Sequence, residues 1–149
     1  MHAQLEEIFE MSGITDVLRL AETFKRIVPF ASKYNLRIVR INVRDYPGSS
    51  PWSKDEIDTI REKRENAKDL IVGMGQELGA FVTWFIKTQN IPALSLNSER
   101  HESGGVSVLS WSLGNSLSLS LLAHVDKLSD DSKDLLGRYL RSIILLGER

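Results

Sequence analysis

The stretch Gly104-Gly105-Val106-Ser107-Val108-Leu109-Ser110-Trp111-Ser112-Leu113-Gly114-Asn115 decides the fold of this chain. It begins as an apolar run rich in valine and leucine, which is typical of a strand buried in a parallel sheet. It then passes through a small-x-Ser-x-Gly turn, and a leucine-rich segment with helical potential follows. We therefore predict a strand at about 106–110, a tight turn centred on Ser112, and a helix after that turn.

This order of strand, turn and helix matches a nucleophile elbow, in which a serine occupies a strained strand-to-helix turn with its hydroxyl exposed. Strand and helix approach closely there, so the residues two before and two after the serine must be small. Ser110 and Gly114 meet this requirement, although Ser110 stands where glycine is usual. So short a motif also occurs by chance, and the prediction therefore depends on the flanking strand and helix.

Length and composition bound the class of protein. The 149 residues predict a single domain, and 42% hydrophobic residues are enough for a core. A net charge of −1 gives no electrostatic footprint for nucleic acid or for anionic membranes. The absence of cysteine excludes a disulfide scaffold, a thiol nucleophile and a zinc-thiolate site. With no long apolar span and no signal-peptide pattern, we expect a soluble, cytoplasmic protein without an integral membrane segment.

The first third of the chain predicts helix and then strand. Residues 4–20 are ambiguous, but four apolar side chains have the spacing of a short amphipathic helix: Leu5, Ile8, Phe9 and Met11. A second helix is predicted over 18–33, in which Pro29 indicates a kink or a shift of the axis. The run Leu36–Val43 is rich in valine and isoleucine and predicts a mostly buried strand.

The middle of the chain predicts two helical segments. Ser53 and Glu56 have the spacing of a capping box, so a charged, solvated helix should begin at Lys54. A buried helix face is then indicated by apolar residues at alternating steps of four and three: Ala67, Ile71, Met74, Leu78, Phe81 and Phe85. One helix over 54–88 would be roughly 50 Å long, so we expect a break between 65 and 75.

Small residues shape the expected packing of the later helices. Gly75 and Gly79 lie one turn apart and are expected to let their helix pack closely on the sheet. Residues 116–121 alternate serine and leucine, which by itself indicates a strand, but leucines at i, i+4 spacing favour a helix. A helix at 131–140, capped at Ser129 or Asp130, and a strand at 142–146 complete the chain. Helices that alternate with buried strands predict an α/β fold with a mostly parallel sheet flanked by helices.

This sequence resembles the α/β-hydrolase superfamily over about residues 20–146. Leu36–Ser50 resembles the strand and Asp-x-x-Gly-x-Ser-type loop that precede the second long helix of that family, and Ser110–Gly114 resembles its elbow. The resemblance implies a serine hydrolase of the esterase or lipase type, acting on a small ester-like substrate. It implies Ser112 as the nucleophile and the backbone N–H of Leu113 as one oxyanion donor.

The family places an acid and then a histidine after the serine, and the chain departs from that pattern. His124 is the only histidine after Ser112 and should lie roughly 15 Å or more from it along the elbow helix. Other poor candidates for these roles are His2, His101 and Glu148. Nothing in residues 1–20 matches the earlier strand and His-Gly loop that supply the second oxyanion donor. We therefore expect a single, partial hydrolase domain over 1–149 that lacks the N-terminal strands and the C-terminal acid/His region: a poorly active fragment.

Other candidate residues receive structural interpretations. Asp45 is expected to anchor a turn rather than to act as a catalytic acid. Trp84 is expected near the buried helix face. For Trp111 the sequence favours neither a place in the core nor a place in the lining of a pocket. No cluster has the spacing of metal ligands and no phosphate loop is present, so no cofactor or metal is expected.

Two other functions remain open. The first is a non-catalytic α/β binding or interaction module that keeps the elbow geometry and self-associates through exposed sheet edges. The second is an anion site at the start of the helix that follows Ser112, although the turn has no lysine and no longer glycine run.

Overall fold

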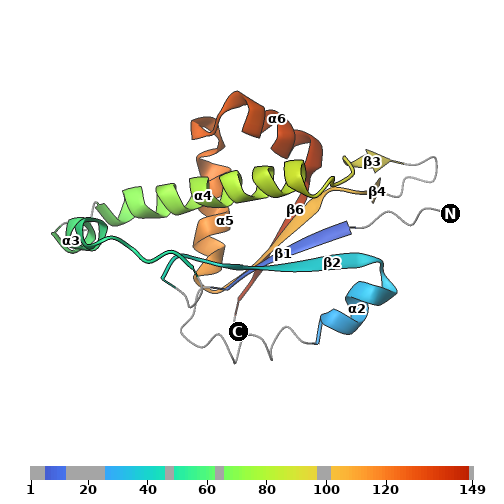
Figure 1. Cartoon of the computed structure of the whole chain (residues 1–149), viewed down its shortest axis with the longest axis horizontal. Coiled ribbons are helices and arrows are strands. Elements are labelled where there is room, and N and C mark those ends of the chain that lie inside the picture. The colour runs from blue at the N-terminus through green and yellow to red at the C-terminus, as the bar shows by residue number, and fades with distance from the viewer. Residues whose placement is uncertain (1–5, 13–25, 46–48, 63–65, 97–101, 148–149) are drawn as a thin grey trace.

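A four-stranded sheet forms the centre of the molecule. The computed structural model describes residues 6–12, 26–45, 49–62, 66–96 and 102–147 (Figure 1). The strand order is β2-β1-β5-β6, and every neighbouring pair is parallel. These strands are β1 (Glu6–Ser12), β2 (Leu36–Asn42), β5 (Val106–Trp111) and β6 (Leu140–Leu146). The predicted α/β architecture, with a mostly parallel sheet flanked by helices, is therefore confirmed.

Helices cover the sheet from both sides (Figure 1). They are α2 (Val28–Lys33), α3 (Lys54–Glu62), α4 (Asn66–Thr88), α5 (Gly114–Ala123) and α6 (Asp130–Tyr139), with a short 3-10 turn at Val125–Lys127. Helices α4, α5 and α6 share the main core with one face of the sheet. On the opposite face Leu109 packs against Ile27, which directly precedes α2. Between α4 and β5 lies a two-stranded antiparallel ladder, β3 (Ser95–Leu96) with β4 (Glu102–Ser103).

Strand β1 corrects the prediction for the N-terminal segment. The sequence was ambiguous here and its apolar spacing suited an amphipathic helix, but residues 6–12 are extended and pair with β2 on one side and β5 on the other. A short apolar run cannot be assigned to helix or strand by periodicity alone. Strands β2 and β5, both distant in sequence, fix the extended form of β1, because each pairs with it through a ladder of backbone hydrogen bonds.

Helix α2 corrects the prediction for residues 18–33. In the described residues the helix begins only at Val28, after a turn at Arg26 and Ile27, and residues 18–25 lie outside that part of the chain. Pro29 therefore occupies the first turn and causes no kink inside the helix. Proline is well accommodated there, because the first N–H groups of a helix have no intrahelical acceptor.

Helix α4 supplies a large share of the core. It runs unbroken from Asn66 to Thr88, and α3 ends at Glu62. The helical region is therefore divided, as predicted, but at the very start of the range 65–75 in which the break was expected. Its buried face begins only at Gly75, and Ile71, which was predicted to be buried, is 39% exposed. The physical reason is visible in Figure 1, where the first turns of α4 extend past the sheet toward α3.

Two glycines set the distance between α4 and α5. A Cβ atom on Gly75 would lie 2.8 Å from the backbone nitrogen of Leu121 and 2.8 Å from Oγ of Ser120. One on Gly79 would lie 2.9 Å from Cδ1 of Leu121. Close packing was predicted correctly, but the partner is the neighbouring helix rather than the sheet.

This contact predicts the effect of a single methyl group. Gly75→Ala should lower the free energy of unfolding by about 1–3 kcal/mol, because the methyl group meets backbone atoms that cannot yield. Gly73→Ala is the matched control, since a Cβ atom there has no neighbour within 4 Å, and it should be neutral or stabilising. Urea denaturation measures both, and equal stability of the two variants would contradict the predicted contact.

Candidate functional site

Ser112 occupies the turn between β5 and α5. The strand ends at Trp111 and the helix begins at Gly114, so the predicted strand, turn and helix are all confirmed. The φ angle of Ser112 is +54°, which is the left-handed region that costs a non-glycine residue about 1–2 kcal/mol. The residue is exposed. A strained, exposed serine is the backbone feature that a nucleophile elbow requires.

Hydrogen bonds on both sides hold this turn in place. The Ser112 N–H donates to the carbonyl of Leu146 at 3.2 Å, and Nδ2 of Asn115 donates to the same carbonyl at 2.8 Å. The Asn115 N–H in turn donates to the carbonyl of Ser112 at 3.0 Å. Strained backbone persists only where the surrounding structure over-determines it, and the end of β6 supplies that support here.

Small residues let α5 lie close against β5. Ser110 is completely buried, and its hydroxyl forms a hydrogen bond with the hydroxyl of Ser118, one turn into α5. Gly114, at the other small position of the motif, is also buried. Serine is therefore tolerated where the motif usually has glycine, because its hydroxyl has a partner on the facing helix.

Leu113 presents the backbone group next to the serine. It is the N-terminal capping residue of α5, with φ −59° and ψ −31°, and it is 56% exposed. The N–H groups of Asn115 and Ser116 donate to the carbonyls of Ser112 and Leu113. Helical geometry supplies no acceptor for the earlier N–H groups, those of Leu113 and Gly114, and the helix dipole favours negative charge beside them. The start of α5 is therefore suited to an oxyanion that forms at Ser112.

The one histidine among the described residues lies far from this serine. His124 is the C-terminal capping residue of α5, and the usual helical rise places it roughly 18 Å along the chain from Ser112. Its Nδ1 lies 3.0 Å from the carbonyl of Ser120, so the ring interacts with its own helix end. His2, His101 and Glu148 lie outside the described residues.

The strand order places Ser112 at a reversal in the sheet. The chain passes from β1 to β2 in one direction and from β5 to β6 in the other, so the order reverses between β1 and β5. At the carboxyl ends of these two strands, Ser12 is the register partner of Trp111. Ligands of open α/β sheets bind outside the carboxyl ends of the strands at such a switch point. Sequence reasoning missed this feature because it did not find β1.

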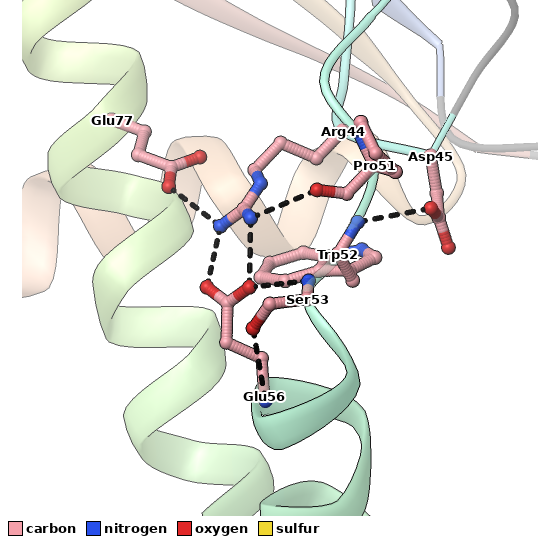
Figure 2. A network of polar contacts seen from close by, with 7 residues as sticks. All are labelled: Arg44, Asp45, Pro51, Trp52, Ser53, Glu56 and Glu77. Atoms are coloured by element: carbon pink, nitrogen blue, oxygen red, sulfur yellow. Dashed lines mark hydrogen bonds and ion pairs between the residues drawn. The ribbon is translucent and has the colours of Figure 1, made fainter.

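Arg44, two residues after β2, joins three segments of the chain (Figure 2). Its guanidinium donates to both carboxylate oxygens of Glu56 at 2.8 Å, and Nη1 lies 3.4 Å from Oε1 of Glu77. Nη2 also donates to the carbonyl of Pro51 at 3.1 Å. The guanidinium carbon lies 4.0 Å from the centre of the Trp52 ring. This cluster fixes the loop after β2 against both α3 and α4.

The same loop confirms two predictions. Glu56 accepts from the N–H of Ser53 at 2.7 Å and Ser53 Oγ accepts from the N–H of Glu56 at 3.2 Å, which is the predicted capping box. Asp45 has φ +70°, and its Oδ1 accepts from the N–H of Trp52 at 3.1 Å. Asp45 therefore anchors the turn, as expected, and its carboxylate is engaged in the loop.

The tryptophans differ in their surroundings. Trp84 lies beside the buried face of α4, with its ring centre 5.7 Å from that of Phe81 and 6.5 Å from that of Phe85. It is nevertheless 55% exposed, so it forms the border of the core rather than part of it. Trp111 is half-buried and packs against Leu109 on the side of the sheet that α2 covers.

Comparison of the chain with protein-family models, with curated proteins and with solved structures gave no match. Among the described residues, no group of three or more histidines and carboxylates is placed to hold a metal ion. None of the helices in that part of the chain is long and apolar enough to cross a membrane.

The Arg44 cluster predicts an acid-dependent contribution to stability. Hydrogen bonds from Arg44 and from Ser53 lower the pKa of Glu56 from 4.5 to about 2. A carboxyl group with a lowered pKa stabilises the folded state above its ordinary pKa, and the effect is lost as the pH falls toward the folded value. The difference in unfolding free energy between the wild type and Glu56→Gln should therefore be largest above pH 4.5 and shrink toward pH 2.

Chemical denaturation at a series of pH values measures this difference. Arg44→Gln should raise the pKa of Glu56 and flatten the same pH dependence, because the largest cause of the lowered pKa is removed. A wild-type minus Glu56→Gln difference that does not change between pH 5 and pH 2 would contradict this account.

Proposed function

We propose that this chain forms a serine hydrolase-type domain of the α/β-hydrolase kind, in which Ser112 attacks a small ester-like substrate. One observation carries the proposal: an exposed serine held at φ +54° between a buried parallel strand and a helix. The elbow of that superfamily places its nucleophile in the same local setting. The reversal of strand order between β1 and β5 adds independent support.

The chemistry follows from the placement of Ser112 beside the start of α5. The serine Oγ adds to the ester carbonyl, the bond to the alcohol breaks as the alcohol takes up a proton, and water then hydrolyses the acyl-enzyme. The Leu113 N–H and the positive end of α5 stabilise the negative charge on the carbonyl oxygen during both steps. Loss of one such donor lowers rates by about 10²–10³.

Strand β1 strengthens the resemblance that the sequence suggested. In α/β-hydrolases the second oxyanion donor comes from the loop that follows a strand preceding the elbow. The sequence contained no recognisable match to such a strand, but β1 pairs with the elbow strand β5 and runs parallel to it. Its last residue, Ser12, is the register partner of Trp111, directly before the proposed nucleophile.

The proposed site needs a general base, and no histidine among the described residues lies near Ser112. A serine hydroxyl is a weak nucleophile until a neighbouring base accepts its proton. His124 is too distant for this role. We therefore expect slow reaction of Ser112 in the chain as it stands, and an added base should accelerate it.

A non-catalytic interaction module is the second candidate function. The described sheet ends at β6, where three consecutive apolar residues are 38–43% exposed: Ile144, Leu145 and Leu146. An exposed apolar edge strand favours pairing with another chain. On this alternative the elbow is retained as a structural turn, and the domain self-associates through its sheet edge.

A fluorophosphonate probe distinguishes the two functions. We expect slow labelling at Ser112, mapped by mass spectrometry, that is faster when imidazole is added as an external base. Ser112→Ala should abolish it, whereas Ser116→Ala in the first turn of α5 should leave it unchanged. Rapid labelling lost in Ser112→Ala would show that a base already lies beside the serine.

Two results would instead favour the interaction module. The first is labelling spread equally over several exposed serines, or retained in Ser112→Ala. The second is no labelling at any imidazole concentration, together with concentration-dependent association in sedimentation.

A further inference from the structure

A cavity of about 390 Å³ lies between α3 and α4, beside the Arg44 cluster. Its volume falls in the range of about 300–1,000 Å³ that is usual for small-molecule sites. Its lining comes from the loop after β2, from α3 and from the first turns of α4. No residue of the elbow contributes to this lining, so the cavity is separate from Ser112.

The cavity has an apolar lining that all three segments supply. Four half-buried side chains form it: Trp52, Ile60, Leu70 and Met74. Figure 2 shows Trp52 at this position, between the start of α3 and the guanidinium of Arg44. Such a lining suits the hydrocarbon part of a ligand, because it removes apolar surface from water on both sides of the contact.

The charges around this apolar lining are predominantly negative. Among the described residues that line the cavity are four carboxylates, those of Asp55, Glu56, Asp69 and Glu77, and one guanidinium, that of Arg44. Arg44 interacts with Glu56 and Glu77. Asp55 on α3 and Asp69 on α4 are exposed and form no ion pair with another described residue. The described part of the lining therefore carries more negative than positive charge, which complements a cation.

Gly73 is one of the α4 residues that line the cavity. It lies in the interior of α4, where glycine is less favourable than alanine. Gly75 and Gly79 are explained by the close approach of α5, but a Cβ atom on Gly73 would meet nothing within 4 Å. No packing contact accounts for this glycine. Because Gly73 lines the cavity and a Cβ atom there has open space around it, we expect a larger side chain at this position to take up space that a ligand would use.

We propose that the cavity between α3 and α4 binds a small organic amine with an apolar body. The ammonium group lies toward Asp55 and Asp69, and the hydrocarbon part contacts Trp52, Leu70 and Met74. Neutral ligands gain only the apolar contact, and organic anions are repelled by the surrounding carboxylates. This proposal does not depend on the hydrolase function of Ser112.

Three matched probes test the charge preference on the full chain. The probes are 2-phenylethylamine, the neutral 2-phenylethanol and the anionic 3-phenylpropanoate, followed by ¹H–¹⁵N NMR titration. The amine should bind saturably and shift the amides of residues that line the cavity. The alcohol should bind at least tenfold more weakly, and the anion should not bind. Equal binding of all three, or no saturable binding of the amine, would overturn the proposal.

Variants locate the site. Gly73→Leu fills the cavity and should abolish amine binding, while Gly137→Leu in α6, where a Cβ atom is equally free, should bind normally. Asp69→Asn should weaken binding severalfold, and Asp58→Asn, on α3 but outside the lining, should not change it. Circular dichroism confirms that each variant is folded. Unchanged amine affinity in Gly73→Leu would refute the site, and unchanged affinity in Ser112→Ala keeps this result separate from the test of the hydrolase function.

Discussion

The close approach of β5 and α5 around Ser112 is the constraint on which the candidate site depends. A strand and a helix joined by so short a turn can lie against each other only if their facing residues are small. The buried hydroxyl pair of Ser110 and Ser118 meets this requirement and leaves neither group without a partner. The carbonyl of Leu146 then holds the turn from the side of β6. The positive φ of Ser112 follows from these contacts together.

The position of α5 depends in turn on α4. Gly75 allows α4 to lie directly against the backbone of α5 near Leu121, and the two helices share the main core with the sheet. A residue far from Ser112 in sequence thereby sets where the elbow helix can lie. The first turns of α4 extend past the sheet toward α3 (Figure 1), and there they line the cavity of about 390 Å³. One helix therefore supports the elbow at one part of its length and lines a separate cavity at another.

Local sequence patterns predicted the strand, turn and helix around Ser112 and the capping box at Ser53. Each is determined by residues within one or two turns of chain. Strand β1 could not be predicted in this way, because its extended form depends on two strands that lie far away in sequence. The same holds for Arg44, whose partners come from α3 and α4, and for the helical partner of Gly75. The periodicity of apolar residues also predicted that Ile71 is buried, whereas it is 39% exposed. Periodicity identifies the apolar face of a helix but not the point at which that helix extends past the sheet.

The pKa of a thiol placed at position 112 tests the central claim most directly. The chain has no cysteine, so Ser112→Cys carries a single thiol, and the pH dependence of its alkylation by iodoacetamide gives the pKa. An exposed side chain beside the first N–H groups of α5 should have a thiol pKa clearly below the usual value of about 8.5. Ser95→Cys, on the exposed strand β3, should show the usual value. A pKa at or above 8.5 for the thiol at position 112 would contradict the account.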